Sequence, residues 1–348
     1  MSKTNVSAAD LRAAIDRLPR VSLAHLPTPL EECKRLSKAL GGPRIFIKRD
    51  DCTGLAFGGN KTRHNEFILA DALETGADLV VWGAGVQSNN CRQTAAACAK
   101  LGLDCHLVLG SDGDSTEVQG NLLLDHLLGA SIEIVEARIG PELDQAITGV
   151  ADRFRAAGRK VFKHDRGNVK IKATTSYVLA TVELVEQFEE LSIRPSTVYS
   201  CASGSTGSGL ALGREALGAN YSLRLLLPIR WPWDTAEDVA KIANQTAEVL
   251  GLDVQVDAST IDVSDDYVGK DYGVPTPECM EAIALLARHE GILLDPNYSG
   301  KAMAGMIDDV RGGRYSADES IVFVHTGGTP ALFASRDALV EAIPQQTR

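Results

Sequence analysis

One lysine, Lys61, stands where an amine would be presented to a flat ligand. It follows Gly58, Gly59 and Asn60, shortly after a strand-like apolar run at 44–50. Glycine has no Cβ, so a backbone of this kind can approach a ring closely. A lysine amine placed in this way can form a Schiff base with a carbonyl compound. This chemistry indicates a pyridoxal-phosphate enzyme, in which the cofactor carries the reaction and the protein directs it.

The two glycines and the lysine alone fit a surface lysine after a tight turn equally well. Asn60 favours the cofactor interpretation, because its amide could hold the phenolic oxygen of a pyridoxal ring.

Small and hydroxyl-bearing residues fill the stretch 200–209, between a predicted strand and a helical run at 210–217. Such a strand-to-helix turn leaves backbone N–H groups free for an anion. The stretch does not match a dinucleotide loop in its usual register, and it lacks the Gly-Lys-Ser/Thr of a Walker A loop. We expect a phosphate monoester here, although a generic Gly/Ser turn is the alternative.

A second candidate anion site lies at 83–90, between an apolar run and an alanine-rich helix. Ser88 is a predicted N-cap, and Asn89 falls in the first turn of that helix. Because a helix N-terminus favours negative charge, the expected ligand is the α-carboxylate of an amino acid. A capped helix with no ligand explains the motif equally well. Two further polar segments, 293–303 and 324–332, follow apolar runs, where ligands gather in open α/β sheets.

Strand and helix patterns alternate over most of the chain, which predicts an α/β protein with parallel sheets and helices on both faces. We expect two domains, each an open, twisted, mostly parallel sheet. The predicted helices include 88–101 and 119–128, and the predicted strands are 79–84, 105–109, 132–135, 197–201, 223–227, 254–256 and 320–324.

Composition narrows the class of function. The 348 residues are 44% hydrophobic and carry a net charge of −11, which argues against binding to nucleic acid or to an anionic membrane. No apolar run has the length of a membrane span, and the first residues lack the apolar core of a secretory signal. The seven cysteines contain no CxxC motif and no zinc spacing, so we expect reduced thiols, a cytoplasmic protein and no metal site.

Together these segments resemble the family of D-cysteine desulfhydrase and 1-aminocyclopropane-1-carboxylate (ACC) deaminase. These are pyridoxal-phosphate enzymes of the tryptophan-synthase-β fold type, known as fold type II. The similarity runs from about Leu26 to Phe333. It is most specific at 48–61, 87–89, 272–275 and 292–303.

The resemblance implies a role for each matching residue. Lys61 is similar to the Schiff-base lysine, and Asn60 to the partner of the ring hydroxyl. Ser88, Tyr272 and Tyr298 complete the implied catalytic set with Lys61. The implied phosphate site comprises Ser203, Gly204, Ser205, Thr206 and Gly207, and the implied substrate-carboxylate site comprises Gln87, Ser88 and Asn89.

The resemblance also implies domain bounds, with a large cofactor-binding domain at 1–62 and 171–348 and a smaller inserted domain at 63–170. The active site is expected in the cleft between them. The implied partners are a small amino-acid substrate and a second copy in a homodimer.

Two positions distinguish the reactions within this family. ACC deaminases carry a glutamate where this chain has Ser299, and a leucine where it has Thr326. Both positions match the desulfhydrases, and a hydroxyl near the pyridine nitrogen makes the ring a weaker electron sink. We therefore expect β-elimination, with Lys61 removing the α-proton and with pyruvate, ammonia and sulfide as products.

Other segments depart from the desulfhydrase pattern and leave alternatives open. The segment 162–172 is unusually basic, 228–233 is unlike the usual sequence, and Asn90 replaces a histidine. Arg166, Lys163 or Arg230 could bind a second substrate anion, as in L-cysteate sulfo-lyases. The remaining alternatives are an ACC deaminase and a pyridoxal-binding or amino-acid-binding protein without turnover.

Overall fold

Two sheets organise the chain. The computed structural model describes residues 5–111 and 116–342, except for the side chains of Arg166, Asn168 and Ala342. The larger sheet has six strands in the order β1-β2-β10-β7-β8-β9. All neighbours in it are parallel except β1 and β2. Its strands are β1 (Leu30–Glu32), β2 (Arg44–Lys48), β7 (Thr197–Ser200), β8 (Ser222–Leu226), β9 (Ile261–Ser264) and β10 (Ser320–Val324).

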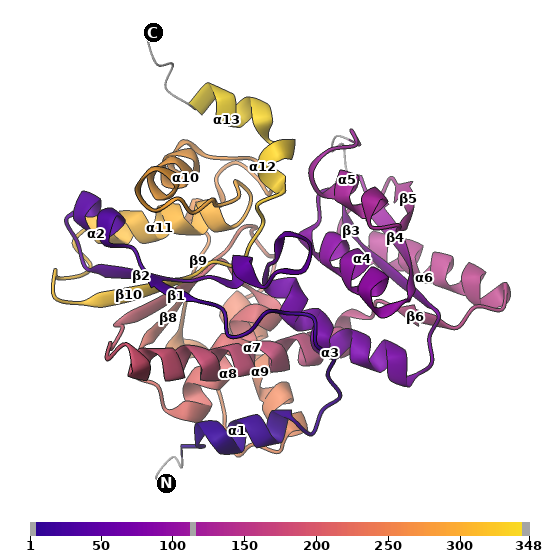
Figure 1. Ribbon diagram of the computed structural model, residues 1–348, viewed down its shortest axis with the longest axis horizontal. Coiled ribbons are helices and arrows are strands. Elements are labelled where there is room, and N and C mark those ends of the chain that lie inside the picture. The colour runs from indigo at the N-terminus through magenta and orange to yellow at the C-terminus, as the bar shows by residue number, and fades with distance from the viewer. Residues whose placement is uncertain (1–4, 112–115, 343–348) are drawn as a thin grey trace.

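Helices cover both faces of the six-stranded sheet (Figure 1). One face packs against α1 (Ala8–Ile15), α7 (Arg166–Glu190), α8 (Gly204–Leu217) and α9 (Thr235–Leu250). The other face packs against α2 (Lys34–Leu40), α10 (Pro277–Glu290) and α11 (Ser299–Arg311). Two short helices, α12 (Ala331–Ala334) and α13 (Arg336–Ala342), follow the last strand.

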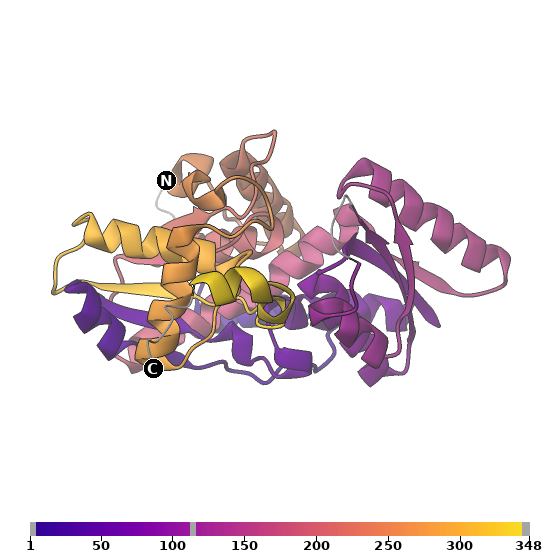
Figure 2. The ribbon, with the colours of Figure 1, turned by 90° about the horizontal axis from the view of Figure 1, so that it is seen from above.

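The smaller sheet has four parallel strands in the order β5-β4-β3-β6, and it stands beside the larger sheet in Figure 2. The helices α3 (Asn60–Glu74), α4 (Asn89–Leu101) and α5 (Gly120–Leu127) cover one face, and α6 (Pro141–Ala156) covers the other. The predicted α/β class, with parallel sheets and helices on both faces, is therefore confirmed. The strands are β3 (Leu79–Gly85), β4 (Asp104–Gly110), β5 (Ser131–Val135) and β6 (Val161–Lys163).

The predicted domain bounds stay a proposal. All four strands of the smaller sheet lie between residues 79 and 163, inside the predicted insertion at 63–170. The bounds themselves fall within α3 and α7, which run between the two sheets in Figure 1.

One predicted strand, at Val254-Gln255-Val256, is wrong, because β9 begins only at Ile261. Val256 is nonetheless buried, which explains the strand-like pattern. The side-chain amide of Asn244 on α9 supplies the hydrogen bonds that a neighbouring strand would have made. Its Oδ1 accepts from the Val256 amide at 2.7 Å, and its Nδ2 donates to the Val256 carbonyl at 3.1 Å.

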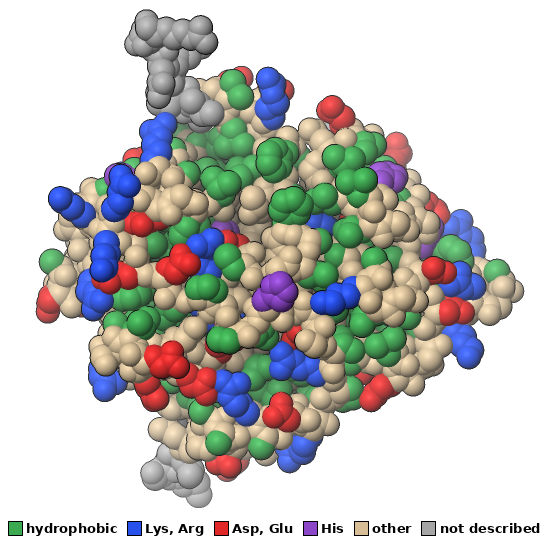
Figure 3. Space-filling view, viewed as in Figure 1, with side chains coloured by type: hydrophobic (Ala, Val, Ile, Leu, Met, Phe, Trp, Pro, Cys, Tyr) green, Lys and Arg blue, Asp and Glu red, His purple; other side chains and the backbone are tan. Residues whose placement is uncertain are grey.

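Charge on the surface is mixed. On the face shown in Figure 3, acidic and basic side chains are interspersed rather than gathered into a basic patch. Within the described residues, no helix combines the length and the hydropathy that crossing a bilayer requires.

A buried ion network joins β2, α3 and α7. Arg63 on α3 donates to both carboxylate oxygens of Asp50, at 2.8 and 3.0 Å, and to both of Glu183 on α7, at 2.9 and 3.1 Å. Lys48 also pairs with Glu183, and the Tyr177 hydroxyl donates to Asp50 at 2.6 Å. Two positive and two negative groups thus neutralise one another at a place that water does not reach.

The network holds its carboxylates in the charged form. Burial alone would raise the pKa of Asp50 and of Glu183, but the charge and hydrogen bonds of Arg63 hold the pKa of each carboxyl below its usual value. The Asp50 carbonyl also accepts from the Gly59 amide at 3.0 Å, so the network reaches the segment that precedes Lys61.

Replacing Arg63 with Met should lower the free energy of unfolding by about 3–5 kcal/mol, because two buried carboxylates lose their partner. Chemical denaturation followed by circular dichroism would measure this change. The control is Arg153→Met, which breaks an exposed ion pair with Glu133 and should cost at most about 1 kcal/mol. Equal effects of the two changes would contradict a structural role for the buried network.

Candidate active site

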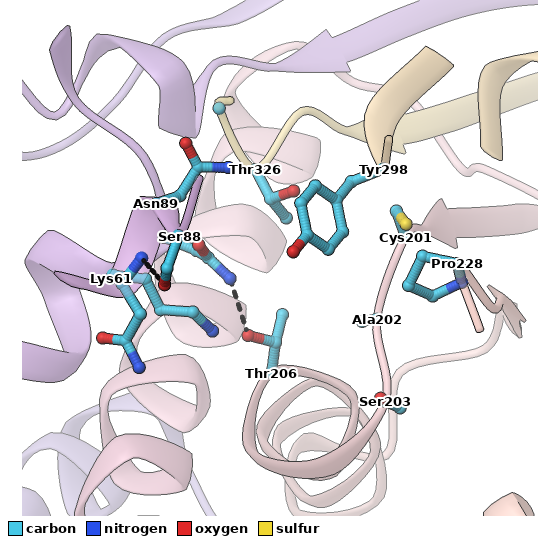
Figure 4. A pocket seen from close by; sticks show the side chains of 13 residues that line it. Lys61, Ser88, Asn89, Cys201, Ala202, Ser203, Thr206, Pro228, Tyr298 and Thr326 are labelled. Carbon is cyan, nitrogen blue, oxygen red and sulfur yellow. Dashed lines mark hydrogen bonds between the residues drawn. The ribbon is translucent and has the colours of Figure 1, made fainter. Parts of the chain in front are cut away.

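Lys61 is the second residue of α3, and its side chain lines a cavity between the two sheets. Figure 4 shows side chains from several elements around this cavity. Its lining comes from the starts of α3, α4 and α11, the loop from β7 into α8, and the loops that follow β8 and β10. The lining residues are Asn60, Lys61, Ser88, Asn89, Asn90, Cys201, Ala202, Ser203, Thr206, Pro228, Tyr298, Thr326 and Gly327.

Two glycines allow the Lys61 loop to pack against the loop after β10. A Cβ built on Gly327 would lie 2.7 Å from the Gly59 Cα, and one on Gly59 would lie 3.0 Å from the Thr326 carbonyl oxygen. Both glycines also have positive φ angles, of 123° at Gly59 and 95° at Gly327. The Asn60 amide donates to the Thr326 carbonyl at 2.9 Å, which joins the two loops. The glycines are needed because one backbone lies directly on another.

Burial changes the chemistry of the Lys61 amine. Desolvation lowers its pKa to about 8, against the weaker opposing effect of the nearby Cys201 thiol. A substantial fraction of the amine is therefore neutral near physiological pH, which is the form that attacks a carbonyl or accepts a proton.

Two residues of α4 hold the Lys61 loop from the side of the smaller sheet. The buried Arg92 donates through Nη2 to the Gly58 carbonyl at 2.9 Å. The Gln93 Oε1 accepts from the Thr62 amide at 2.6 Å and from its hydroxyl at 2.9 Å. The Thr62 amide belongs to the first turn of α3, so Gln93 caps this helix from outside.

The start of α8 fits an anion. Ser203 is its N-cap residue, but the Ser203 side chain makes no capping hydrogen bond. The first N–H groups of the helix therefore have no side-chain acceptor, and Ala202, Ser203 and Thr206 face the cavity beside them.

Three of the predicted phosphate-site residues do not line the cavity. The Ser205 hydroxyl donates to the Lys170 carbonyl at 3.1 Å, and Gly207 lies close to Leu225 of β8. Gly204 begins the helix with a φ of 51°. The backbone of this turn, rather than its hydroxyls, is what the structure offers to an anion.

Thr206 links α8 to α3. Its Oγ1 accepts from the Asn60 Nδ2 at 3.1 Å and lies 3.2 Å from the His64 Nε2. Burial lowers the pKa of His64 well below its usual value, with the Lys61 and Arg63 charges acting in the same direction. A neutral imidazole therefore lies behind the cavity wall, and the Asn60 amide is held at the cavity edge.

The residues predicted to hold a substrate carboxylate lie at the start of α4. Ser88 is the N-cap, and its Oγ accepts from the Asn90 amide at 3.1 Å and from the Cys91 amide at 3.2 Å. Both Ser88 and Asn89 line the Lys61 cavity.

Gln87, predicted to bind the substrate, does not line the Lys61 cavity. Its amide bridges to the start of α5, donating to the Gln119 carbonyl at 3.1 Å and accepting from the Asn121 amide at 2.9 Å. The Asn121 side chain in turn donates to the Gln87 carbonyl and to the Asn89 Oδ1. Gln87 therefore orients the loop that carries Ser88 and Asn89, and it borders an adjoining hollow rather than the Lys61 cavity.

The two predicted tyrosines meet through their hydroxyl groups. Tyr298 lines both the Lys61 cavity and the adjoining hollow, whereas Tyr272 lines only the hollow. Their rings cross at 67° with centroids 5.8 Å apart. Burial, together with the neighbouring Tyr272, raises the pKa of Tyr298 well above its usual value, so its hydroxyl keeps its proton.

The two positions that distinguish the reactions differ in their placement. Thr326 lines the cavity. Ser299 is fully buried and does not line it, and its hydroxyl donates to the Asp295 Oδ1 at 2.6 Å. Asp295 also accepts the amides of Asn297, Tyr298 and Ser299, each at 2.8 Å. Ser299 therefore belongs to a buried turn that shapes the start of α11.

Of the basic residues suggested for a second substrate anion, Lys163 and Arg230 do not line the cavity. Lys163 donates to the Thr148 hydroxyl at 3.1 Å, and Arg230 donates to the Gly269 carbonyl at 2.9 Å. Arg166 is the first residue of α7, and its side chain lies outside the described part of the structure.

Several lining residues were not predicted as site residues. Cys201 and Pro228 follow β7 and β8, and Gly327 follows β10. Cys201 and Gly327 fall within the predicted ligand segments 200–209 and 324–332, and Pro228 lies beyond the carboxyl end of β8 in the same way. Asn90 stood out in the sequence only as a departure from a family pattern.

Comparisons with known proteins agree with this geometry. A family model described as "Pyridoxal-phosphate dependent enzyme" matches residues 21–327. The chain is 40% identical to a D-cysteine desulfhydrase of Salmonella typhi over 92% of its own length and 97% of the relative's. It is 41% identical to a D-cysteine desulfhydrase of Serratia proteamaculans (strain 568), over 93% and 98%.

Solved structures give the same result. The crystal structure of an ACC deaminase homologue is 34% identical, has a TM-score of 0.87 and covers 96% of this chain and 99% of its own. Diaminopropionate ammonia lyase of Escherichia coli, in apo form, has a TM-score of 0.67 at 15% identity, covering 100% of this chain and 96% of its own. At that identity the likeness concerns the fold alone.

The lowered pKa of Lys61 predicts how its amine reacts with pH. In protein freed of bound carbonyl compounds, labelling of Lys61 by an amine-selective reagent should rise with pH through a midpoint near 8. Mass spectrometry of the peptides would measure it, with the exposed Lys241 on α9 as the internal control for the reagent. A midpoint near 10.4, the value of a free lysine, would contradict the proposed effect of burial.

Proposed function

Because the chain belongs to the family of pyridoxal-phosphate dependent enzymes, we propose that it is a lyase that acts on D-cysteine and releases sulfide, pyruvate and ammonia. The observation that carries this proposal is the single cavity that brings together a half-buried lysine, two helix N-termini and a protonated tyrosine. Each of these groups matches one part of an amino-acid substrate bound to the cofactor.

The residues present fit pyridoxal phosphate. The uncapped start of α8 offers backbone N–H groups for the phosphate, and Ser203 and Thr206 stand beside them. Lys61 supplies the amine for the aldehyde, and the Asn60 amide lies at the cavity edge where it can meet the ring hydroxyl. Thr326, whose carbonyl accepts from the Asn60 amide, also lines the cavity and offers it a neutral hydroxyl. When bound, the cofactor supplies an electron sink for negative charge that develops at the substrate α-carbon.

Lys61 has two tasks in this proposal. Its amine would hold the cofactor, and as a free base the Lys61 Nζ would accept the proton from the substrate α-carbon. Its pKa of about 8 suits both tasks, because a base works best when its pKa lies near the working pH.

The start of α4 orients the substrate. The positive end of the helix and the Asn89 side chain would hold the α-carboxylate, which fixes the direction of the bond from the α-carbon to its hydrogen. Ser88 keeps this turn in place through its two hydrogen bonds to the backbone.

Tyr298 faces the same cavity and retains its proton, so it can donate a hydrogen bond to the departing sulfur or to the carboxylate. Tyr272, bonded to its hydroxyl, orients that proton. Donors of this kind lower the barrier when they are aimed at charge that develops as the bond breaks.

Sulfide is favoured over the other leaving groups. An L-cysteate sulfo-lyase needs a place for a sulfonate, yet Lys163 and Arg230 are bonded elsewhere. ACC deaminase chemistry is favoured by the structural likeness to an ACC deaminase homologue, but Thr326 and Ser299 are unlike the leucine and glutamate expected there. A binding protein without turnover would not need an amine with a lowered pKa.

The remaining parts of the proposal concern the protein in the cell. We propose a cytoplasmic homodimer, because the seven cysteines of the chain carry no disulfide pattern and closed dimers are the commonest oligomers. Size-exclusion chromatography with light scattering would measure the oligomeric state.

The proposed reaction predicts the products. Purified protein supplied with pyridoxal phosphate should release sulfide and pyruvate in equal amounts from D-cysteine, while L-cysteate and ACC should react at least about tenfold more slowly. Lys61→Ala should abolish turnover and the visible absorbance of the bound cofactor, because the amine that holds it is gone.

The matched control is Lys241→Ala, which removes an exposed lysine from α9 and should leave both signals unchanged. Sulfite from L-cysteate as the main product would favour the sulfo-lyase, and 2-oxobutyrate from ACC would favour the deaminase. Normal turnover by Lys61→Ala would refute the proposed role of the lysine.

Thr326 tests the role of the neutral hydroxyl in the cavity. Thr326→Val keeps the shape of the side chain and removes its oxygen, so kcat/KM for D-cysteine should fall about threefold to tenfold through the loss of one hydrogen bond. Steady-state kinetics would measure this change, and an unchanged kcat/KM would show that the hydroxyl contributes nothing. Ser299→Glu is a poorer test, because it would place a second carboxylate against the buried Asp295.

A further inference from the structure

Tyr272 stands on the loop between β9 and α10, which the Tyr267 hydroxyl fastens to α11 by donating to Asp308 at 2.6 Å. We call residues 266–276 the tyrosine loop; it connects β9 to α10 and begins with a single 3₁₀ turn, Asp266–Val268. On one side it borders the hollow that contains Tyr272 and Gly273. On its other side, Gly269 and Thr276 border a second hollow, which α10 and α11 complete. A loop placed between two hollows depends on specific contacts to keep its shape.

Lys301 on α11 supplies such contacts. Its side chain is 1% exposed, and its Nζ donates to the Val268 carbonyl at 2.6 Å and to the Asp271 carbonyl at 3.0 Å. Asp271 directly precedes Tyr272, so the ammonium is hydrogen-bonded to the backbone next to the tyrosine.

This ammonium has no carboxylate partner within ion-pair distance among the described residues. Burial of an unpaired charge is costly, and desolvation accordingly lowers the pKa of Lys301. An apolar side chain of similar length would fill the same space without that cost. The Lys301 ammonium donates its hydrogen bonds to the two loop carbonyls, which explains why a charged residue stands here.

The place of Lys301 on its helix connects it to the other tyrosine. Tyr298 is the N-cap residue of α11, and Lys301 follows it by three residues, so both lie on one side of the first turn. The start of α11 therefore presents Tyr298 directly and holds Tyr272 through the loop. The contact between the two tyrosine hydroxyls depends on both attachments.

Arg230 makes a hydrogen bond to the same loop from the solvent-exposed side. Its Nη1 donates to the Gly269 carbonyl at 2.9 Å, and its side chain is exposed. Three carbonyls of the loop, at residues 268, 269 and 271, are thus held by two cations from different elements.

We propose that Lys301 is a positioning residue, which, with Arg230, clamps the backbone of the tyrosine loop and thereby keeps the Tyr272 hydroxyl on the Tyr298 hydroxyl. The kinetic part of this inference rests on the proposed function, because it assumes that the tyrosine pair acts in turnover. The mechanical part does not, because it concerns only the loop.

Hydrogen exchange tests the mechanical part. In the holoenzyme, Lys301→Met should raise amide exchange within residues 266–276 by about tenfold or more, because two charge-assisted hydrogen bonds are lost. Arg230→Met should raise it by a smaller factor, and its exposed position makes it independent of any folding defect in the first variant. Arg311→Met is the control, since it removes a cation from the same helix whose partner is Glu281 on α10. Unchanged exchange in Arg230→Met and in folded Lys301→Met would overturn the proposal.

A double-mutant cycle tests the kinetic part. Lys301→Met alone should lower kcat/KM for D-cysteine about tenfold to 100-fold, with most of the loss in kcat, while the affinity for pyridoxal phosphate stays within about twofold. In a Tyr272→Phe background the same change should cost little more, because the group that it positions is already absent. Independent, multiplying effects would mean that Lys301 acts by another route.

The two parts can fail separately. If Tyr272→Phe turns over normally while Lys301→Met loosens the loop, the clamp stands and the proposed function of the tyrosine pair fails. If Tyr272→Phe is impaired and the loop of both cation variants stays rigid, the proposed function stands and the clamp fails.

Discussion

The site depends on a buried set of opposite charges that fixes where α3 begins. Arg63 on α3 and Lys48 on β2 share the carboxylates of Asp50 and Glu183, so the lysine helix, the central sheet and α7 are joined at one point. Directional hydrogen bonds between charged groups fix the angle and register of a helix more sharply than apolar packing does. Lys61 lies two residues before Arg63, and its position follows from that anchoring.

The cavity is lined by the first residues of helices and by loops that follow strands, not by the middle of any element. The starts of α3, α4, α8 and α11 and the loops after β7, β8 and β10 all meet there. Parallel strands point their carboxyl ends to one edge, and helices that follow them begin at that edge. The positive ends of α4 and α8 therefore face the cavity from two directions, which suits a ligand with an anionic group at each end.

The sequence was sufficient for the elements whose patterns are local. The strand 320–324, the helix beginning after Ser88 and the glycine-supported lysine were predicted from adjacent residues, and the structure contains all three. Contacts between residues that are far apart in the chain could not be predicted from the sequence. The residues next to Val256 in the sequence do not show that the Asn244 side chain will hydrogen-bond to its backbone. The residues next to Gln87 and Arg230 do not show that each side chain will bond to a neighbouring loop instead of a ligand. Such pairings depend on the folded arrangement.

The bonds from α4 to the Lys61 loop make the two walls of the cavity unequal. Arg92 and Gln93 join α4 to Gly58 and Thr62, so the start of α4 and the Lys61 loop are bonded to each other. Tyr298 also lines the cavity, and its hydroxyl meets that of Tyr272, whose loop has hollows on both sides. The groups proposed to receive the α-proton and the α-carboxylate are thus joined to each other by direct hydrogen bonds, whereas one member of the tyrosine pair depends on a loop for its position.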